Sequence, residues 1–190
     1  MSEIITIFEK NTTLSIPAAL ISLPEGLEEA KQIARDLIMT LTPLMPAAGL
    51  AGPQIGISKQ IFVYSWNRTL ETLEVAINPR ILSESSEKYT SWEACFSTMN
   101  ESEIIAAKVS RPVSIDVEYY SLKLAKFIKK RLVGFGAKVF VHEYDHLRGI
   151  ENVRKEGAET KSFSERAAFV EFMKATKNID RDLYLAPSDL

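Results

Sequence analysis

Both histidines of the chain lie in one pentapeptide, His142-Glu143-Tyr144-Asp145-His146. On an α-helix, residues four positions apart share one face, so both imidazoles can reach the same metal ion. The carboxylate of Glu143, beside the first histidine, can act as a base toward a water molecule at that ion. Two structural histidines are the alternative, but most neighbouring positions are apolar, and an unpaired buried cluster of this kind would be costly. The pattern therefore predicts a metal-binding helix.

A catalytic metal site usually has three protein ligands and leaves one position for water. Apart from the two histidines, the only soft ligand in the chain is its single cysteine, Cys95. A lone cysteine is more often an inert buried residue, so its candidacy depends on the histidines. We expect Cys95, His142 and His146 to hold one divalent metal ion. By its general chemistry, such a ligand set suits zinc.

Three helices are expected to surround or carry this site. Residues 136–148 are apolar on most helical faces, which predicts a helix largely buried in the domain centre, with Gly149 just past its end. A first helix should follow Pro24 and stop near Pro43, because apolar residues there recur at helical spacing. A last amphipathic helix is expected from roughly Ser164 to Lys177.

Between these helices the chain shows several strand patterns. Residues 60–66 and 114–121 are rich in strand formers, and residues 74–82 read as a strand broken at Pro79. Residues 45–56 are small and interrupted by proline and glycine, so no regular element is expected there. The sum is an α+β domain of mixed or antiparallel strands around a central metal-binding helix. We expect one domain over residues 1–177 and a short polar tail over residues 178–190.

Composition narrows the function further. The 190 residues carry a formal net charge of −2, with 46% hydrophobic and 25% charged residues. This balance predicts no nucleic-acid-binding domain and no membrane association, and no apolar run approaches the roughly 20 residues that span a bilayer. The amino terminus shows no pattern of a secretory signal, and a single cysteine fits a reducing compartment. We expect a cytoplasmic protein.

Three blocks of sequence resemble the signature motifs of peptide deformylases, in the same order. Residues 49–56 (GLAGPQIG) resemble the family's glycine-alanine loop that ends in a glutamine. Residues 93–97 (EACFS) resemble its Glu-Gly-Cys-Leu-Ser block, and residues 142–149 (HEYDHLRG) its His-Glu-x-Asp-His-Leu-x-Gly helix. The resemblance extends over roughly residues 20–155 and implies a peptide deformylase-like fold.

The resemblance also implies an activity and its residues. The family removes the N-formyl group from formyl-methionyl peptides and releases formate. Cys95 matches its metal-ligating cysteine, and Glu143 would be the general base and then the general acid. The Gln54 side-chain amide and the Phe96 backbone N–H would donate to the oxyanion, while Gly49 and Leu50 would bind the substrate as an added strand.

The implied cofactor is one iron(II) ion, with zinc, nickel or cobalt as other ions that such enzymes accept. The implied partners are an N-formylated peptide or nascent chain and, transiently, the ribosome. Two further positions should support the site. Glu93 is expected to pair with Arg111, and Asp145 to fix the geometry of the helix or its ligands.

Five positions depart from the family pattern: Ala47, Gly52, Ala94, Phe96 and Val141. Alanine would be strained wherever the replaced glycine had a positive φ, and the added groups would narrow the substrate cleft. The residues expected to do the chemistry are all retained. The departures therefore indicate that the chemistry is retained and that recognition of the substrate is altered.

Two other functions use the same helix. The first is a deformylase-like protein that binds metal or formyl peptides with altered specificity or without efficient turnover, which the departures favour and the retained Glu143 disfavours. The second is a zinc endopeptidase with an H-E-x-x-H helix. Cys95 as third ligand disfavours it, since such proteases normally use histidine or glutamate there.

Overall fold

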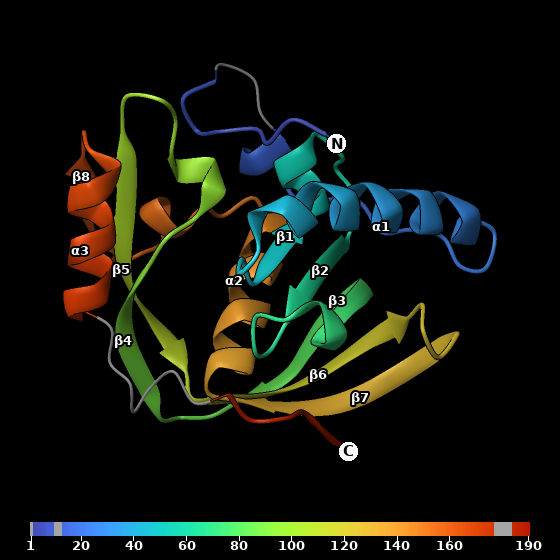
Figure 1. Ribbon diagram of the computed structural model, residues 1–190. Coiled ribbons are helices and arrows are strands. Elements are labelled where there is room, and N and C mark those ends of the chain that lie inside the picture. Colours follow the sequence, from blue (N-terminus) through green and yellow to red (C-terminus); the bar gives the residue numbers. More distant parts are fainter. Residues whose placement is uncertain (1, 10–12, 177–183) are drawn as a thin grey trace.

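Helix α2 (Phe135–Leu147) runs through the middle of the protein, between a six-stranded and a three-stranded sheet (Figure 1). The computed structural model describes residues 2–9, 13–176 and 184–190. Most of α2 is buried, and Gly149 follows it with a φ of 73°, the left-handed conformation that ends many helices. The predicted central helix is confirmed, with bounds shifted by one residue.

The larger sheet has the strand order β1-β2-β3-β6-β7-β9, and each neighbouring pair is antiparallel. Its strands are β1 (Gly49–Ala51), β2 (Ile61–Ser65), β3 (Leu73–Glu84), β6 (Ser114–Ser121), β7 (Lys126–Val133) and β9 (Ser188–Asp189). The strand expected to break at Pro79 continues beyond it. The register with β6 shifts between Ile77 and Arg80, so the missing proline N–H falls in an irregular part of the ladder.

The smaller sheet has the order β4-β5-β8 and is also antiparallel. Its strands are β4 (Lys88–Glu93), β5 (Ile104–Pro112) and β8 (Glu159–Phe163). Helix α3 (Arg166–Thr176) lies against this sheet, where the rings of Trp92 and Phe172 meet edge to face at 4.9 Å (Figure 1). This helix matches the expected last helix.

Helix α1 (Leu27–Leu41) covers the larger sheet near β2. Its buried face carries Ala30, Ile33, Ala34 and Leu37, apolar residues at the helical spacing expected after Pro24, while Leu27 at its start is half-buried. Six short 3-10 helices complete the described elements: Thr13–Ser15, Thr42–Leu44, Gly52–Ile55, Leu70–Thr72, Phe96–Thr98 and Asn152–Arg154. Among the described helices, none combines the length and apolar character needed to cross a bilayer.

Residues 45–56 are more regular than expected. Gly49–Ala51 form β1, and Gly52–Ile55 form a 3-10 helix. The expectation of no regular element was wrong. Strand β1 forms because it pairs with β2, and the local sequence of residues 45–56 does not indicate that pairing. The side-chain oxygen of Gln54 also accepts a bond of 2.8 Å from the Ala51 N–H.

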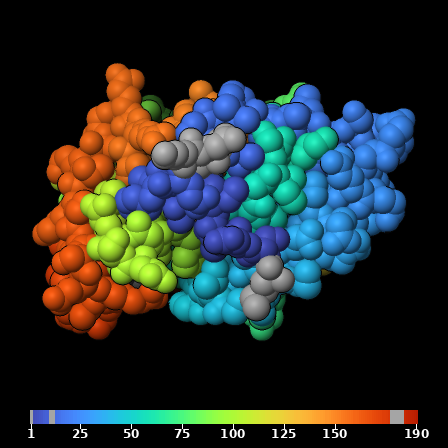
Figure 2. All heavy atoms as spheres, turned by 90° about the horizontal axis from the view of Figure 1, so that it is seen from above, coloured from blue at the N-terminus to red at the C-terminus, as the bar shows by residue number. Residues whose placement is uncertain are grey.

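The two ends of the chain lie against the domain. Residues 177–183 lie outside the described residues; beyond them, β9 pairs with β7, and the rings of Tyr184 and Phe135 are 5.1 Å apart. At the other end, the Ile5 N–H donates to the Gln54 carbonyl and the Ile7 N–H to the Ser97 carbonyl, each at 2.8 Å. Figure 2 shows this segment (dark blue) between the chain near residue 100 and the turn near residue 55.

Candidate metal centre and catalytic site

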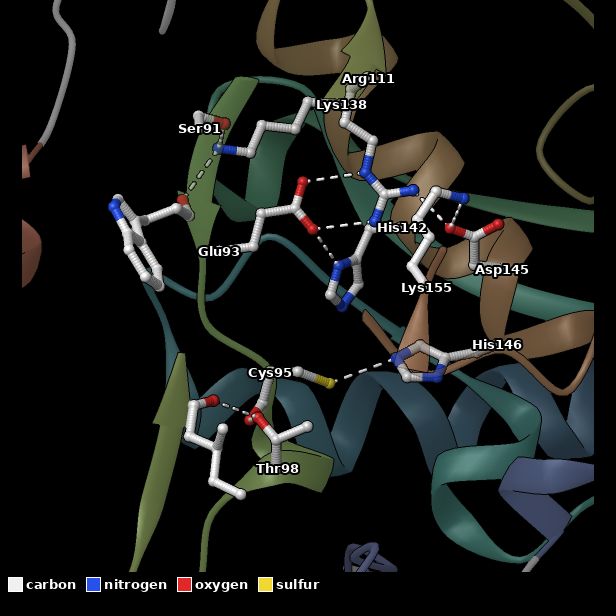
Figure 3. Close-up of polar contacts among 12 residues, drawn as sticks. Ser91, Glu93, Cys95, Thr98, Arg111, Lys138, His142, Asp145, His146 and Lys155 are labelled. Atoms are coloured by element: carbon white, nitrogen blue, oxygen red, sulfur yellow. Dashed lines mark hydrogen bonds and ion pairs between the residues drawn. The ribbon is translucent and has the colours of Figure 1, made fainter. Parts of the chain in front are cut away.

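Three candidate metal ligands converge from two elements. Cys95 follows strand β4, and His142 and His146 occupy successive turns of α2. The ligand atoms of these residues all lie within 4.8 Å of one another, and the Cys95 sulfur is 3.3 Å from His146 Nε2 (Figure 3). Ligands that bind one tetrahedral ion at about 2.0–2.3 Å are separated by comparable distances. The arrangement and the donor types fit a divalent metal ion.

The orientation of His142 is set by Glu93. His142 Nδ1 lies 2.9 Å from a Glu93 carboxylate oxygen, which leaves Nε2 of the same ring for a metal. Arg111 donates to both oxygens of Glu93, at 3.0 Å and 2.9 Å, so the expected Glu93–Arg111 pair is confirmed (Figure 3). Burial alone would raise the pKa of Glu93, but the Arg111 guanidinium and the bond to His142 hold it well below its usual range. Glu93 is therefore ionised where it contacts His142.

Asp145 supports this arrangement from the other side of the guanidinium. Arg111 also donates to Asp145, and Lys155 donates to the same Asp145 oxygen at 2.8 Å. The Arg111 side chain is fully buried, so these carboxylates balance a charge that water does not reach. Asp145 thus lies where we expected it, next to the residues that hold His142 in position. Lys155 was not foreseen, because no local pattern links it to the helix.

Glu143 is almost fully buried and lies against the backbone of β1. A Cβ atom added to Gly49 would lie 2.5 Å from Glu143 Oε1, so only glycine leaves room for this carboxylate. Within the described part of the chain, Glu143 Oε2 has no hydrogen-bond partner. Burial raises the pKa of Glu143 to about 7. A buried, unpaired carboxylate beside the ligands is placed to exchange a proton with a bound molecule.

The amide of Gln54 is held in one orientation. Its oxygen accepts the Ala51 N–H, so its nitrogen faces Cys95 Sγ at 3.5 Å and Ser97 Oγ at 3.2 Å. Phe96 begins a 3-10 helix, and the first N–H of a helix has no partner within it. Both groups expected to stabilise an oxyanion therefore lie beside Cys95. Ser97 was missed as an orienting residue, although it stands in the block that contains the cysteine.

A cleft of about 440 Å³ opens onto these groups. It is bordered by β1 and β4, each at the edge of its sheet, and by helices α2 and α3. Residues that line it include Ala47, Ala48, Gly49, Gln54, Arg68, Trp92, Glu93, Ala94, Cys95, Phe96, Phe135, Lys138, Val139, His142, Arg166, Phe169 and Met173. Leu50 is fully buried in the core instead, so a substrate contact from it would have to come from the backbone.

The departures from the family pattern fall in three environments. Ala47, Ala94 and Phe96 line the cleft. Neither alanine has a positive φ, so the backbone strain considered for these positions does not arise. Gly52 is confined, because a Cβ there would lie 2.8 Å from the Ile57 carbonyl oxygen. Val141 is buried in the core on another face of α2.

Comparison with known proteins agrees with this geometry. The family described as polypeptide deformylase matches residues 1–159. Peptide deformylase 2 of Nostoc sp. is 32% identical over 150 residues, which cover 74% of this chain and 78% of that protein. The peptide deformylase of Thermotoga neapolitana is 35% identical over 102 residues. This match covers 54% of this chain and 57% of that protein, so the chain spans little more than half of its length.

Solved structures extend the likeness to most of the fold. An actinonin-bound class I type b peptide deformylase from Acinetobacter baumannii superposes with a TM-score of 0.69 and 28% identity, covering 82% of this chain and 99% of that one. Peptide deformylase from Thermotoga maritima gives a TM-score of 0.66 and 30% identity, covering 80% and 94%. The chain therefore belongs to the polypeptide deformylase family.

Proposed function

We propose that this protein hydrolyses the N-formyl group of formyl-methionyl peptides, with Glu143 as base and Cys95, His142 and His146 as metal ligands. The observation that carries the proposal is that the ligand atoms of Cys95, His142 and His146 lie within 4.8 Å of one another beside a cleft bordered by two sheet edges, with Glu143 packed against Gly49 of that cleft. When bound, a divalent ion would supply a Lewis acid that lowers the pKa of a water molecule. Family resemblance favours iron(II), and zinc, nickel and cobalt suit the same ligands.

The proton transfers belong to Glu143. Its carboxylate takes a proton from the attacking water and later donates it to the amine nitrogen of the leaving peptide. While the water oxygen bonds to the formyl carbon, the carbonyl oxygen gains negative charge. The Gln54 amide and the Phe96 N–H donate to that oxygen. The carbon–nitrogen bond then breaks, leaving formate and a free amino terminus.

The substrate backbone would add to the edge of the larger sheet. Strand β1 is paired with β2 on one side only, so its other edge can bond to an extended peptide. Gly49 lies at the point where this edge meets Glu143, which would bring the formyl group to the base. The related Acinetobacter baumannii enzyme has been solved with Met-Ala-Ser bound. A nascent chain in the cytoplasm, met transiently at the ribosome, is the source of formyl peptide that we propose.

Release of formate tests the proposal directly. Protein loaded with iron(II) without oxygen should release formate from formyl-Met-Ala-Ser and leave unformylated Met-Ala-Ser intact. Glu143→Gln should keep the metal and lose nearly all hydrolysis, because an amide cannot accept the proton. Metal-loaded protein that binds the formyl peptide without turnover would support a binding module instead. Cleavage of the unformylated peptide would support an endopeptidase.

A further inference from the structure

Cationic side chains line the cleft in front of the metal ligands, although the whole chain has a net charge of −2. Three cationic residues line it: Arg68, Lys138 and Arg166. One acidic residue lines it, Glu93, and the buried Glu143 lies against the lining residue Gly49. Glu93 is already bound to Arg111, and Glu143 is the proposed base. Among the described residues, neither Arg68 nor Arg166 forms an ion pair with an acidic side chain.

Arg68 stands on the β1 side of the cleft. Its guanidinium carbon lies 4.4 Å from the centre of the Phe135 ring, and Nη1 donates to the Pro46 carbonyl at 3.1 Å. Both partners are neutral, so they fix the position of the guanidinium without cancelling its charge. The side chain is exposed and remains accessible to a bound peptide.

Lys138 lies one helical turn before His142, on the side of α2 that faces the cleft. Its ammonium donates to the Ser91 hydroxyl at 2.8 Å and to the Trp92 carbonyl at 3.4 Å, so it lies along strand β4 (Figure 3). The ammonium therefore lies between the metal ligands and strand β4, while the cations of the cleft that lack an ion pair among the described residues are Arg68 and Arg166.

Arg166 is the first residue of α3 and is exposed at the cleft. The same helix turns Phe169 and Met173 into the cleft, and its Phe172 packs on Trp92. The helix therefore sets Arg166 against the smaller sheet, whereas Arg68 lies on the side of the larger one. A peptide extended between the two sheet edges would pass between cations on either side.

We infer that the cleft selects formyl peptides with a carboxylate in the residues that follow the formyl-methionine. The inference rests on the proposed deformylation and names the substrate class for that site. The carboxylate could belong to an acidic side chain or to the free carboxyl terminus of a short peptide. Each exposed charge pair of this kind strengthens binding by roughly two- to fivefold. The gain should appear in KM, because these charges are remote from the reacting carbonyl.

Four formyl peptides of matched length separate these sources. They are formyl-Met-Ala-Ser-amide, formyl-Met-Ala-Glu-amide, formyl-Met-Ala-Lys-amide and formyl-Met-Ala-Ser with a free carboxylate. We expect kcat/KM for the Glu peptide to exceed that for the Lys peptide by about tenfold at low salt, with the neutral amide between them. The difference should shrink sharply at 0.5 M salt, where the screening length falls to only a few ångströms. A gain for the free carboxylate alone would assign the site to a peptide terminus.

Variants test which residues make the selection. Arg166→Gln and Arg68→Gln should each lower the Glu-to-Lys ratio of kcat/KM by about threefold. Arg80→Gln is the matched control, since Arg80 is exposed on β3 and does not line the cleft. It should leave the ratio as in the parent protein.

Equal kcat/KM for the Glu and Lys peptides at all salt concentrations would overturn the inference and leave the deformylase function standing. Absence of formate from all four peptides would instead overturn the proposed function. In that case, the affinities of the same peptides for metal-loaded Glu143→Gln protein still decide the charge preference. Indistinguishable affinities there would overturn it independently of turnover.

Discussion

At the scale of single residues, the Glu143 carboxylate occupies the space beside Gly49, which leaves no room for a methyl group at position 49. Gly49→Ala would place a Cβ 2.5 Å from Glu143 Oε1, so the carboxylate must move. We expect kcat to fall by about 100-fold, as for other displacements of a catalytic group by about 1 Å. Metal content should be unchanged, because no ligand is replaced.

The measurement is kcat at matched metal occupancy. Gly157→Ala is the control, since its Cβ would meet nothing within 4 Å; its positive φ of 74° makes alanine strained there, but no catalytic group is displaced. Full activity in Gly49→Ala would show that Glu143 is not held by this contact or is not the base.

The departures from the family pattern permit a second prediction at this scale. Ala47 and Ala94 line the cleft, whereas Val141 is buried in the core. Restoring glycine at 47 and 94 widens the cleft and should raise kcat/KM on formyl-Met-Ala-Ser by about tenfold, a change of about 1.4 kcal/mol. Val141→Gln would bury an amide without a partner and should destabilise the protein by about 1–3 kcal/mol.

Steady-state kinetics and urea unfolding of these variants decide between the two effects. If Val141→Gln raised activity and the glycine variants did not, support of the ligands rather than fit of the substrate would limit turnover.

Much of the site follows from short-range pattern. His142, Glu143 and His146 are set by helical spacing, and Cys95 by the absence of any other soft ligand. The contact of the Gln54 amide with Ser97 and the bond from Lys155 to Asp145 depend on where distant loops pack, which no local spacing encodes. Strain at a replaced glycine likewise depends on its φ, which only the fold reveals.

At the scale of elements, the amino-terminal segment ties two parts of the site together. Ile5 bonds to the Gln54 carbonyl and Ile7 to the Ser97 carbonyl, so one short stretch joins the loop with the amide donor to the loop after Cys95. Deleting residues 1–8 should lower Tm by roughly 5 °C, since each hydrogen bond contributes about 1 kcal/mol. It should also lower kcat, because Gln54 and Phe96 lose a common support.

Thermal unfolding and formate release, compared at equal metal content, check this prediction. An unchanged Tm and kcat after the deletion would show that the two loops hold their positions without the segment.

Helix α1 and strand β6 were predictable because their apolar residues recur at a regular period, whereas β2 was predictable as a run of strand-forming residues, all of which are buried. In β6, residues alternate between half-buried and buried throughout, as the pattern at 114–121 indicated. Strands β7 and β8 were not predicted. Strand β7 carries Lys126, Lys129, Lys130 and Arg131, and β8 is almost wholly exposed, so neither shows an apolar stripe. Pairing with β6 and β5 forms these strands, and that pairing is not a local property.

At the scale of the whole molecule, the buried charges should make stability depend on pH. The pKa of Glu93 is held below its usual 4.5, so the stability it contributes is present above that pH and is lost as pH falls further. In metal-free protein, Glu93→Gln should reduce the free energy of unfolding by about 3 kcal/mol at pH 7, because Arg111 loses a buried partner. The difference from the parent should shrink below about pH 4.5.

Urea unfolding of both proteins between pH 7 and pH 3 provides the test. Two parallel curves over that range would mean that Glu93 and Arg111 do not stabilise the fold as a charged pair.

We propose that Cys95, His142 and His146 hold one catalytic metal ion. The most direct measurement is metal per chain and formate release in the same samples, as a chelator removes the metal. We expect one ion per chain at full activity, activity that falls in proportion to occupancy, and loss of both in Cys95→Ala. Full occupancy in Cys95→Ala, or formate release from metal-free protein, would contradict it.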